Sequence, residues 1–182
     1  AAHEAGLVHR DIKPSNLFLH ENDDGTVIVK ICDFGIAKES VLAENETVLT
    51  RTGGILGTPA YMSPEQAHDS RSVDVRSDVW SLSAALYETV AGTGPWHGAK
   101  NVGEMLASLY SREVPALQSV APWVEPELSS AIHRGLVRDR AARLQSASAL
   151  RALLEPMAQS GPVRTGDVRG VDDDARARKA KH

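Results

Sequence analysis

Three polar residues with complementary chemistry lie within six positions near the start of the sequence. In the stretch LVHRDIKPSNLFLH (residues 7–20), Asp11 is followed by Lys13 and Asn16. A carboxylate can accept a proton from an attacking hydroxyl, and a lysine can balance the charge of a phosphoryl group. A side-chain amide oxygen is a hard ligand of the kind that suits Mg²⁺. Together these residue types predict a phosphoryl-transfer site.

A second carboxylate, Asp33, is predicted to lie beside Asn16. Residues 16–20 and 26–34 are short β-rich segments, and the turn-forming residues Asn-Asp-Asp-Gly at 22–25 separate them, which predicts a β-hairpin. The return strand ends at Asp33, and Gly35 lets the backbone turn sharply there. The hairpin therefore places two oxygen ligands for Mg²⁺ side by side.

The remaining elements that must position this site are mostly helical. Apolar periodicity predicts helices over residues 79–92, 101–110, 127–138 and 146–155, with Ser77 and Asp78 as caps of the first. The Ala-rich start is typical of a helix that ends at Gly6. Residues 35–60 show no sustained period, as in a functional or a disordered loop, and residues 156–182 are expected to be a disordered linker. The fold class is α+β, mainly helical.

Composition narrows the class of protein. The 182 residues allow one domain or one domain with a tail, and the 4% of aromatic residues indicates a largely aliphatic core. A net charge of -4 gives no reason to expect nucleic-acid binding. Cys32 is the only cysteine, which excludes an intramolecular disulfide and fits a reducing, cytoplasmic compartment. As a residue of a strand, Cys32 is expected to be buried. No apolar run in this chain approaches the ~20 residues that span a bilayer.

Five segments, in order, resemble the motifs of protein kinases. HRDIKPSN (9–16) is similar to the family's catalytic loop, and Asp-Phe-Gly (33–35) to its metal-binding motif. GTPAYMSPE (57–65) resembles the end of the activation loop, DVWSL (78–82) the central helix, and RDRAAR (138–143) the stretch before the last helix. The resemblance covers residues 1–155 and is greatest to the eukaryotic-like serine/threonine kinases of bacteria. It implies the large C-terminal lobe of a kinase, with the hairpin carrying the catalytic loop.

The resemblance implies roles for the residues of the site. The reaction would transfer the γ-phosphate of ATP to serine or threonine hydroxyls of proteins, with Mg²⁺ as the cofactor. Asp11 would orient and deprotonate the hydroxyl, Lys13 would neutralise the transferred phosphate, and Asn16 and Asp33 would hold Mg²⁺. Thr58 would lie against Asp11 and Lys13 and shape the substrate pocket. Phe18 matches a position under the adenine ring, or is alternatively a core aromatic residue of its strand.

Other matched residues would regulate or support the site. Arg10 would receive a phosphorylated activation loop, with Thr50 and Thr52 as the phosphorylated residues, and one copy could phosphorylate another in trans. His9 would be structural, packing on Phe34 and bonding to Asp78, whereas His3 is expected at the surface. A further supporting contact would be a buried salt bridge between two distant residues, Glu65 and Arg143.

The sequence also departs from the family pattern. Ser83 stands where the central helix commonly has glycine. No glycine-rich loop or strand lysine precedes Asp11, so the N-terminal lobe is expected to be absent from this chain and its isolated activity low. The full-length protein could carry a downstream membrane anchor. Two alternatives stay open: a pseudokinase or scaffold, disfavoured by the intact catalytic and metal-binding residues, and a small-molecule phosphotransferase, disfavoured by residues 57–65.

Overall fold

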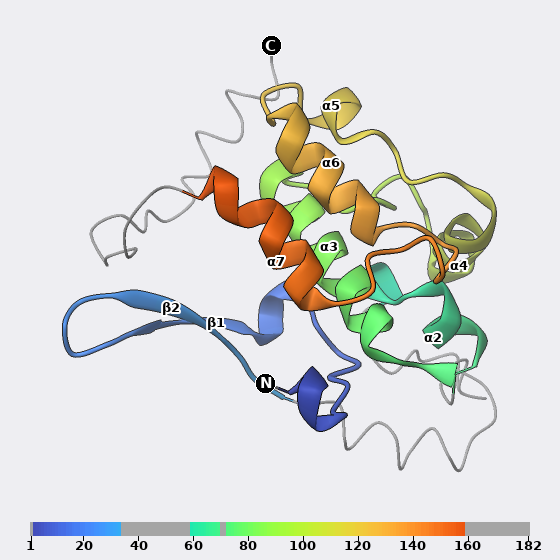
Figure 1. Cartoon of the computed structure of the whole chain (residues 1–182). Coiled ribbons are helices and arrows are strands. Elements are labelled where there is room, and N and C mark those ends of the chain that lie inside the picture. The colour runs from blue at the N-terminus through green and yellow to red at the C-terminus, as the bar shows by residue number, and fades with distance from the viewer. Residues whose placement is uncertain (1, 34–58, 70–71, 159–182) are drawn as a thin grey trace.

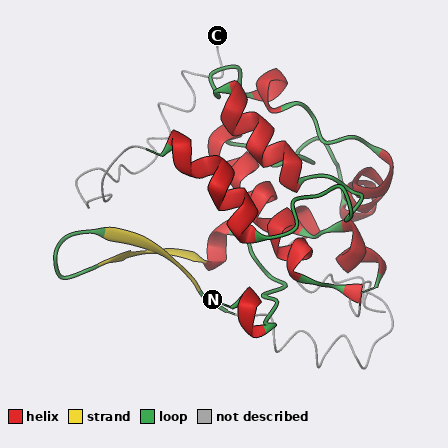
Figure 2. Ribbon diagram, in the orientation of Figure 1, coloured by secondary structure: helices red, strands yellow, loops and turns green. Residues whose placement is uncertain are grey.

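The computed structural model describes residues 2–33, 59–69 and 72–158, which form a helical body and one two-stranded sheet (Figure 1, Figure 2). The α-helices are α2 (Pro64–His68), α3 (Val75–Ala91), α4 (Val102–Ser111), α5 (Leu117–Val120), α6 (Pro126–Gly135) and α7 (Ala147–Leu154). Single 3₁₀ turns are η1 (His3–Ala5), η2 (Pro14–Asn16), η3 (Pro59–Tyr61) and η5 (Glu155–Met157). This composition agrees with the predicted α+β, mainly helical class.

Helix α3 is the central element of the helical body. It contacts α5, α6, α7 and the η3 turn, and α6 and α7 cover it in Figure 1. The helix begins four residues earlier than predicted, because Asp74 and not Ser77 or Asp78 is its cap: the Asp74 side chain accepts a hydrogen bond from the backbone of Arg76. It ends at Gly92, whose left-handed φ of 75° lets its N–H bond to the carbonyl of Glu88.

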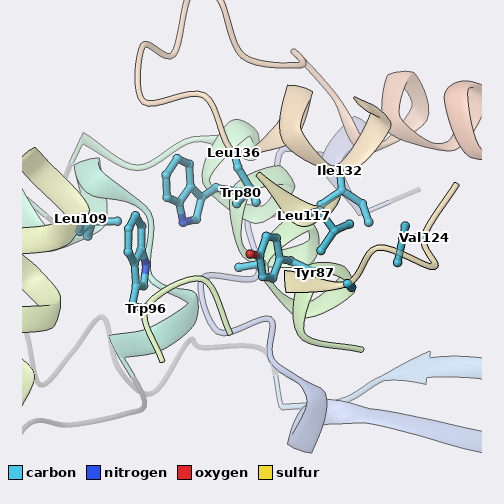
Figure 3. Close-up of a cluster of buried hydrophobic side chains, with 10 residues drawn as sticks. Trp80, Tyr87, Trp96, Leu109, Leu117, Val124, Ile132 and Leu136 are labelled. Atoms are coloured by element: carbon cyan, nitrogen blue, oxygen red, sulfur yellow. The ribbon is translucent and has the colours of Figure 1, made fainter. Parts of the chain in front are cut away.

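The larger of two apolar clusters in the described residues packs between α3 and the helices around it (Figure 3). Trp80 and Tyr87 project from α3 and are at most 1% exposed, and Trp96 joins them from the segment after the helix. The other buried members are aliphatic: Ala84, Leu109, Leu117, Ala121, Val124, Ile132 and Leu136. The core is thus mostly aliphatic, as composition predicts, but large aromatic rings fill its centre. Burial of these side chains holds α3 rigidly in place.

The predicted hairpin is present and extends away from the helices (Figure 1). Strands β1 (Leu17–Glu21) and β2 (Val27–Ile31) are antiparallel, with Leu17 opposite Ile31 and Glu21 opposite Val27. Large apolar side chains remain exposed on the hairpin: Phe18, Leu19, Ile28, Val29 and Ile31. The buried position expected for Cys32 is wrong, because this residue directly after β2 is exposed as well.

Several boundaries differ from the sequence-based expectations. Gly6 does end a helical segment with a left-handed φ of 74°, but that segment is only the η1 turn. The short helices α2 and α5 were not predicted. Residues 156 and 157 of the predicted linker lie in the η5 turn, and residues 159–182 lie outside the described ranges. Within those ranges no helix combines the length and the apolar character needed to cross a membrane.

Candidate active site

Asp11, Lys13 and Asn16 lie together in the structure. Lys13 Nζ is 3.0 Å from Asp11 Oδ2, and both side chains are less than one-fifth exposed. The buried Asn16 donates from Nδ2 to the Asp11 carbonyl at 2.8 Å and to its Oδ2 at 3.2 Å. The η2 turn makes this possible, because Pro14 presets its first position and the chain then enters β1. The Asp11 carboxylate is therefore contacted by the Lys13 ammonium group and by the Asn16 amide.

His9 connects Asp11 with the end of the return strand, at the base of the hairpin. Its ring nitrogen Nδ1 accepts a hydrogen bond from the Asp11 backbone N–H at 3.3 Å. Nε2 must then carry the ring proton, and it donates to the Cys32 carbonyl at 3.1 Å. The ring thus joins Asp11 to the residue before Asp33. The expectation that His9 bonds to Asp78 is correct only for its backbone, since it is the His9 N–H that donates to Asp78 Oδ2 at 2.7 Å.

Asp78 is the buried anchor of the loop that carries Asp11. Its carboxylate accepts two backbone N–H bonds, from His9 and from Arg10, the second at 2.8 Å. His3, which was expected at the surface, has a side chain that is 25% exposed, and its Nε2 lies 2.8 Å from the same carboxylate. Arg10 has a φ of 64°, which costs a non-glycine residue about 1–3 kcal/mol. The bonds to Asp78 stabilise that conformation.

Asp33 lies at the base of the hairpin, directly after the residue that pairs with Asn16. The Cys32 N–H donates to the Asn16 carbonyl at 2.9 Å, so Cys32 is opposite Asn16 in the hairpin register. Asp33 is the next residue along the chain. Asp33 has a φ of 58°, a left-handed turn directly after the strand. The Asn16 amide nitrogen makes both bonds to Asp11, which leaves its oxygen as the end suited to a cation. Asn16 and Asp33 thus fit two oxygen ligands of Mg²⁺.

The described residues offer no richer metal site than this pair. Among them no group of three or more His, Cys, Asp and Glu side chains is placed to hold a metal ion. Mg²⁺ typically takes one or two protein ligands together with phosphate oxygens and water. A site with one carboxylate and one amide is therefore suited to a metal that arrives with a phosphorylated substrate.

Glu65 and Arg143 form the buried ion pair that was expected between them. The contact is bidentate, with Arg143 Nη1 donating to Oε1 at 2.7 Å and Nη2 to Oε2 at 3.0 Å. Ser77 Oγ also donates to Glu65, at 2.6 Å. Burial alone would raise the pKa of Glu65, but the hydrogen bonds from Arg143 and Ser77 outweigh burial, and the pKa lies below its ordinary value. The pair fixes α2 against the start of α3.

A glutamine that the sequence analysis did not single out reaches the same loop. Gln66, next to Glu65 in α2, donates from Nε2 to the carbonyl of Arg10 at 2.9 Å. Its spacing from Ser63 matches the Ser-x-x-Gln capping box, so α2 had a sequence signal, whereas the contact with Arg10 had none.

The segment just before α2 is fixed to α3. Ser81 Oγ in α3 donates to the Tyr61 carbonyl at 2.8 Å, and the Tyr61 hydroxyl donates to Glu88. Burial, together with the bond to Glu88, raises the pKa of Tyr61. The chain that leads from the predicted activation loop into α2 therefore has a defined position.

Of the other residues predicted for the site, the structure describes Phe18 and Arg10. Phe18 is half exposed on β1, so its alternative interpretation as a core aromatic residue is wrong. Arg10 is partly buried beside Asp11. Phe34, Thr50, Thr52 and Thr58 lie outside the described residues.

The arrangement can support proton acceptance and charge stabilisation in one place. The carboxylate of Asp11 accepts hydrogen bonds and carries an adjacent ammonium group from Lys13. Asn16 and Asp33 both lie at the base of the hairpin, where Cys32 pairs with Asn16 and Asp33 follows it in the chain. A hydroxyl nucleophile near Asp11 and a phosphoryl group near Lys13 would each find a group of suitable charge.

Comparison with known proteins points in the same direction. A family model described as the protein kinase domain matches residues 1–154. The serine/threonine-protein kinase PknL of Mycobacterium tuberculosis is 40% identical over 162 residues, which cover 87% of this chain and 37% of that protein. PknB of Mycolicibacterium smegmatis is 37% identical over 151 residues (83% and 23%), and AfsK of Streptomyces coelicolor is 46% identical over 128 residues (70% and 15%). The chain thus spans well under half the length of these curated relatives.

Proposed function

Because the chain belongs to the protein kinase domain family, we propose that it carries the catalytic loop of a serine/threonine protein kinase. The proposed reaction transfers the γ-phosphate of ATP to a serine or threonine hydroxyl of a protein. The observation that carries the proposal is the joint placement of Asp11, Lys13 and Asn16, with the ion pair at 3.0 Å and the amide bonded to Asp11. The named relatives, all serine/threonine-protein kinases, support the choice of acceptor.

In this proposal each residue of the site has one task. Asp11 orients the acceptor hydroxyl and takes its proton as the oxygen attacks the γ-phosphorus. The new O–P bond forms while the bond to the bridging oxygen breaks, and ADP leaves with that oxygen. Lys13 balances the negative charge on the transferred group. Asn16 and Asp33 bind Mg²⁺, which when bound neutralises charge on the phosphates.

The finer assignments are part of the same proposal. Residues 1–155 would form the large, C-terminal lobe of the kinase domain, with the hairpin at its nucleotide side and Phe18 next to the adenine. Thr58 would complete the substrate pocket beside Asp11. The proposed compartment is the cytoplasm, which the single cysteine fits, and the proposed partners are protein substrates.

The test uses the full-length protein that contains this sequence, with labelled ATP and a protein acceptor. Asp11→Asn is expected to lower kcat by about 10²–10⁴-fold, the usual contribution of a general base. Asp23→Asn is the matched control, because Asp23 is an exposed carboxylate in the hairpin turn. Acid hydrolysis of the product should yield phosphoserine or phosphothreonine. Unchanged transfer by Asp11→Asn, or transfer only to small molecules, contradicts the proposal.

The proposed metal ligands predict a separate effect. Asp33→Asn should raise the Mg²⁺ concentration needed for half-maximal rate, because a neutral amide replaces an anionic ligand. Asp24→Asn in the hairpin turn provides the control, since its carboxylate bonds to Thr26 on an exposed loop. An identical Mg²⁺ titration for the parent and Asp33→Asn would remove Asp33 from the ligand set.

We also propose regulation through Arg10, with phosphorylated Thr50 or Thr52 as its partner. Thr50→Ala combined with Thr52→Ala should lower the rate of the intact kinase, and phosphatase treatment should lower the parent to the same level. Thr47→Ala, in the same segment, is the control. If the double variant retains the parental rate, this regulation is ruled out. A rate of self-phosphorylation that rises with protein concentration would support the trans reaction.

A further inference from the structure

The peptide bond between Arg10 and Asp11 is held from both sides. Its N–H, which belongs to Asp11, donates to the His9 ring at 3.3 Å. Its carbonyl, which belongs to Arg10, accepts from Gln66 Nε2 at 2.9 Å. The residue before this bond is in the left-handed region, with a φ of 64°. The plane of this peptide sets where the Cα of Asp11 lies and where its side chain can point.

The amide of Gln66 has a fixed orientation. Its oxygen Oε1 accepts from the Ser63 backbone N–H and from the Ser63 hydroxyl, both at 3.1 Å. The backbone N–H of Gln66 in turn donates to Ser63 Oγ at 3.3 Å, which completes a capping box. Because the oxygen is taken by Ser63, the NH₂ group is the end that faces Arg10. A glutamate in this position would present an oxygen to a carbonyl oxygen.

The helix that carries Gln66 is rigidly attached to the rest of the molecule. Glu65 is locked to the buried Arg143 and to Ser77. Pro64 contributes its carbonyl to a hydrogen bond from the Tyr110 hydroxyl at 3.2 Å, which ties α2 to α4. Gln66 therefore reaches the loop of Asp11 from a helix that is bonded to α3, α4 and Arg143.

We infer that Gln66 is a positioning residue for phosphoryl transfer: through the Arg10 carbonyl it fixes the peptide that aims the Asp11 carboxylate. This inference rests on the proposed kinase function, because it assigns Gln66 a part in that reaction. A contact so close to the general base affects the transition state more than the binding of either substrate. Small displacements of a catalytic group are costly, up to ~10²-fold in rate for about an ångström.

The test measures kcat and both KM values for Gln66→Leu and Gln66→Glu in the full-length protein. Leucine removes the amide at similar volume, and glutamate keeps an acceptor for Ser63 but loses the donor to Arg10. Both should lower kcat by about tenfold or more. Both should leave the KM for ATP and for the protein substrate within about twofold of the parent, because only orientation is lost. Rates are normalised to the folded fraction measured by circular dichroism.

Two controls separate positioning from a general structural role. Gln145→Leu removes a glutamine amide that donates to the Arg140 carbonyl at 2.9 Å, away from the site, and should keep the parental kcat. Ser63→Ala removes the capping hydroxyl but leaves the Ser63 N–H on Oε1, so Gln66 keeps its orientation and most of the rate. A parental kcat in both Gln66 variants overturns the inference. An equal loss of kcat in Ser63→Ala or Gln145→Leu also overturns it.

Including Asp11→Asn in the series separates a failure of the proposed kinase function from a failure of the positioning role of Gln66. If the parent shows no transfer that depends on Asp11, the proposed function fails, and the role of Gln66 fails with it. If transfer depends on Asp11 but not on Gln66, only the positioning role is wrong.

Discussion

Arg143→Ala should be among the most destabilising substitutions in the molecule. All five N–H donors of this buried guanidinium are used. Nε donates to the Val137 carbonyl, Nη1 to Glu65 and to the Arg76 carbonyl, and Nη2 to Glu65 and to the Arg138 carbonyl. The guanidinium also lies over the ring of a core tryptophan, 5.0 Å from its centre. Alanine leaves a buried carboxylate without its cation and three carbonyls without their donor.

The magnitude follows from the burial of the pair. Removal of one partner from a buried ion pair costs about 3–5 kcal/mol, mainly because the other charge stays buried and unpaired. In a domain of this size each kcal/mol lowers Tm by roughly 2–4 °C, so we expect a decrease of about 6–20 °C. Thermal unfolding of the full-length protein, followed by circular dichroism, measures the transition. Arg140→Ala is the control: its ion pair with Asp74 is more than one-third exposed, and its loss should cost ~1 kcal/mol or less.

The dependence on pH adds a second check. The pKa of Glu65 lies below its ordinary value, so the stabilisation by its ionised form is fully present above the ordinary pKa of a glutamate. It is lost as pH falls below that value, through the pKa of the folded state. The difference in Tm between the parent and Arg143→Ala should therefore shrink in that acidic range. A Tm for Arg143→Ala within about 2 °C of the parent at neutral pH would refute the reasoning.

Three further predictions concern other buried contacts. Burial lowers the pKa of His133, whose Nε2 accepts a hydrogen bond from the Leu117 N–H. The stabilisation by the neutral ring is therefore fully present above the ordinary pKa of histidine and is lost as pH falls below it. Across this pH range, Tm should fall less steeply in His133→Gln than in the parent. Asp78→Ala leaves the backbone N–H groups of His9 and Arg10, in the proposed catalytic loop, without their acceptor and should lower both Tm and kcat, whereas a change in Tm alone would argue against its anchoring role. Gly135→Ala would place a Cβ 1.9 Å from Ser83 Oγ and should cost about 1–3 kcal/mol in chemical denaturation, a loss that adding Ser83→Gly should largely reverse.

The elements with strong local patterns were predictable from the sequence. Amphipathic repeats gave the four longer helices, and the Asn-Asp-Asp-Gly turn gave the hairpin with Asp33 returning beside Asn16. Such patterns depend only on neighbours a few residues apart. The prediction for Cys32 was wrong because a local pattern does not show whether another layer covers the strand. The apolar side chains of this hairpin are exposed, and Cys32 is exposed with them.

Contacts between distant residues were predictable only where the family resemblance supplied them. The pairing of Glu65 with Arg143, 78 residues apart, came from that source. His3 with Asp78 and Gln66 with Arg10 join residues 75 and 56 positions apart, and neither pair leaves a periodic signal. The sequence alone shows that Ser83 stands where the central helix of the family commonly has glycine. Only the structure shows that a glycine on α6 makes room for it.

The first turn of α3 shows most clearly why contacts between distant residues could not be derived from the sequence. Polar residues before an apolar run predict a helix start, and on that ground Ser77 and Asp78 were expected to cap the helix. The cap is Asp74, whereas Ser77 bonds to Glu65 and Asp78 binds the proposed catalytic loop. A carboxylate can be buried in a first turn because the helix dipole favours it there and because three donors converge on it. Two of those donors are backbone N–H groups of residues 9 and 10, so the role of Asp78 is decided by a loop that lies 68 residues away in the sequence.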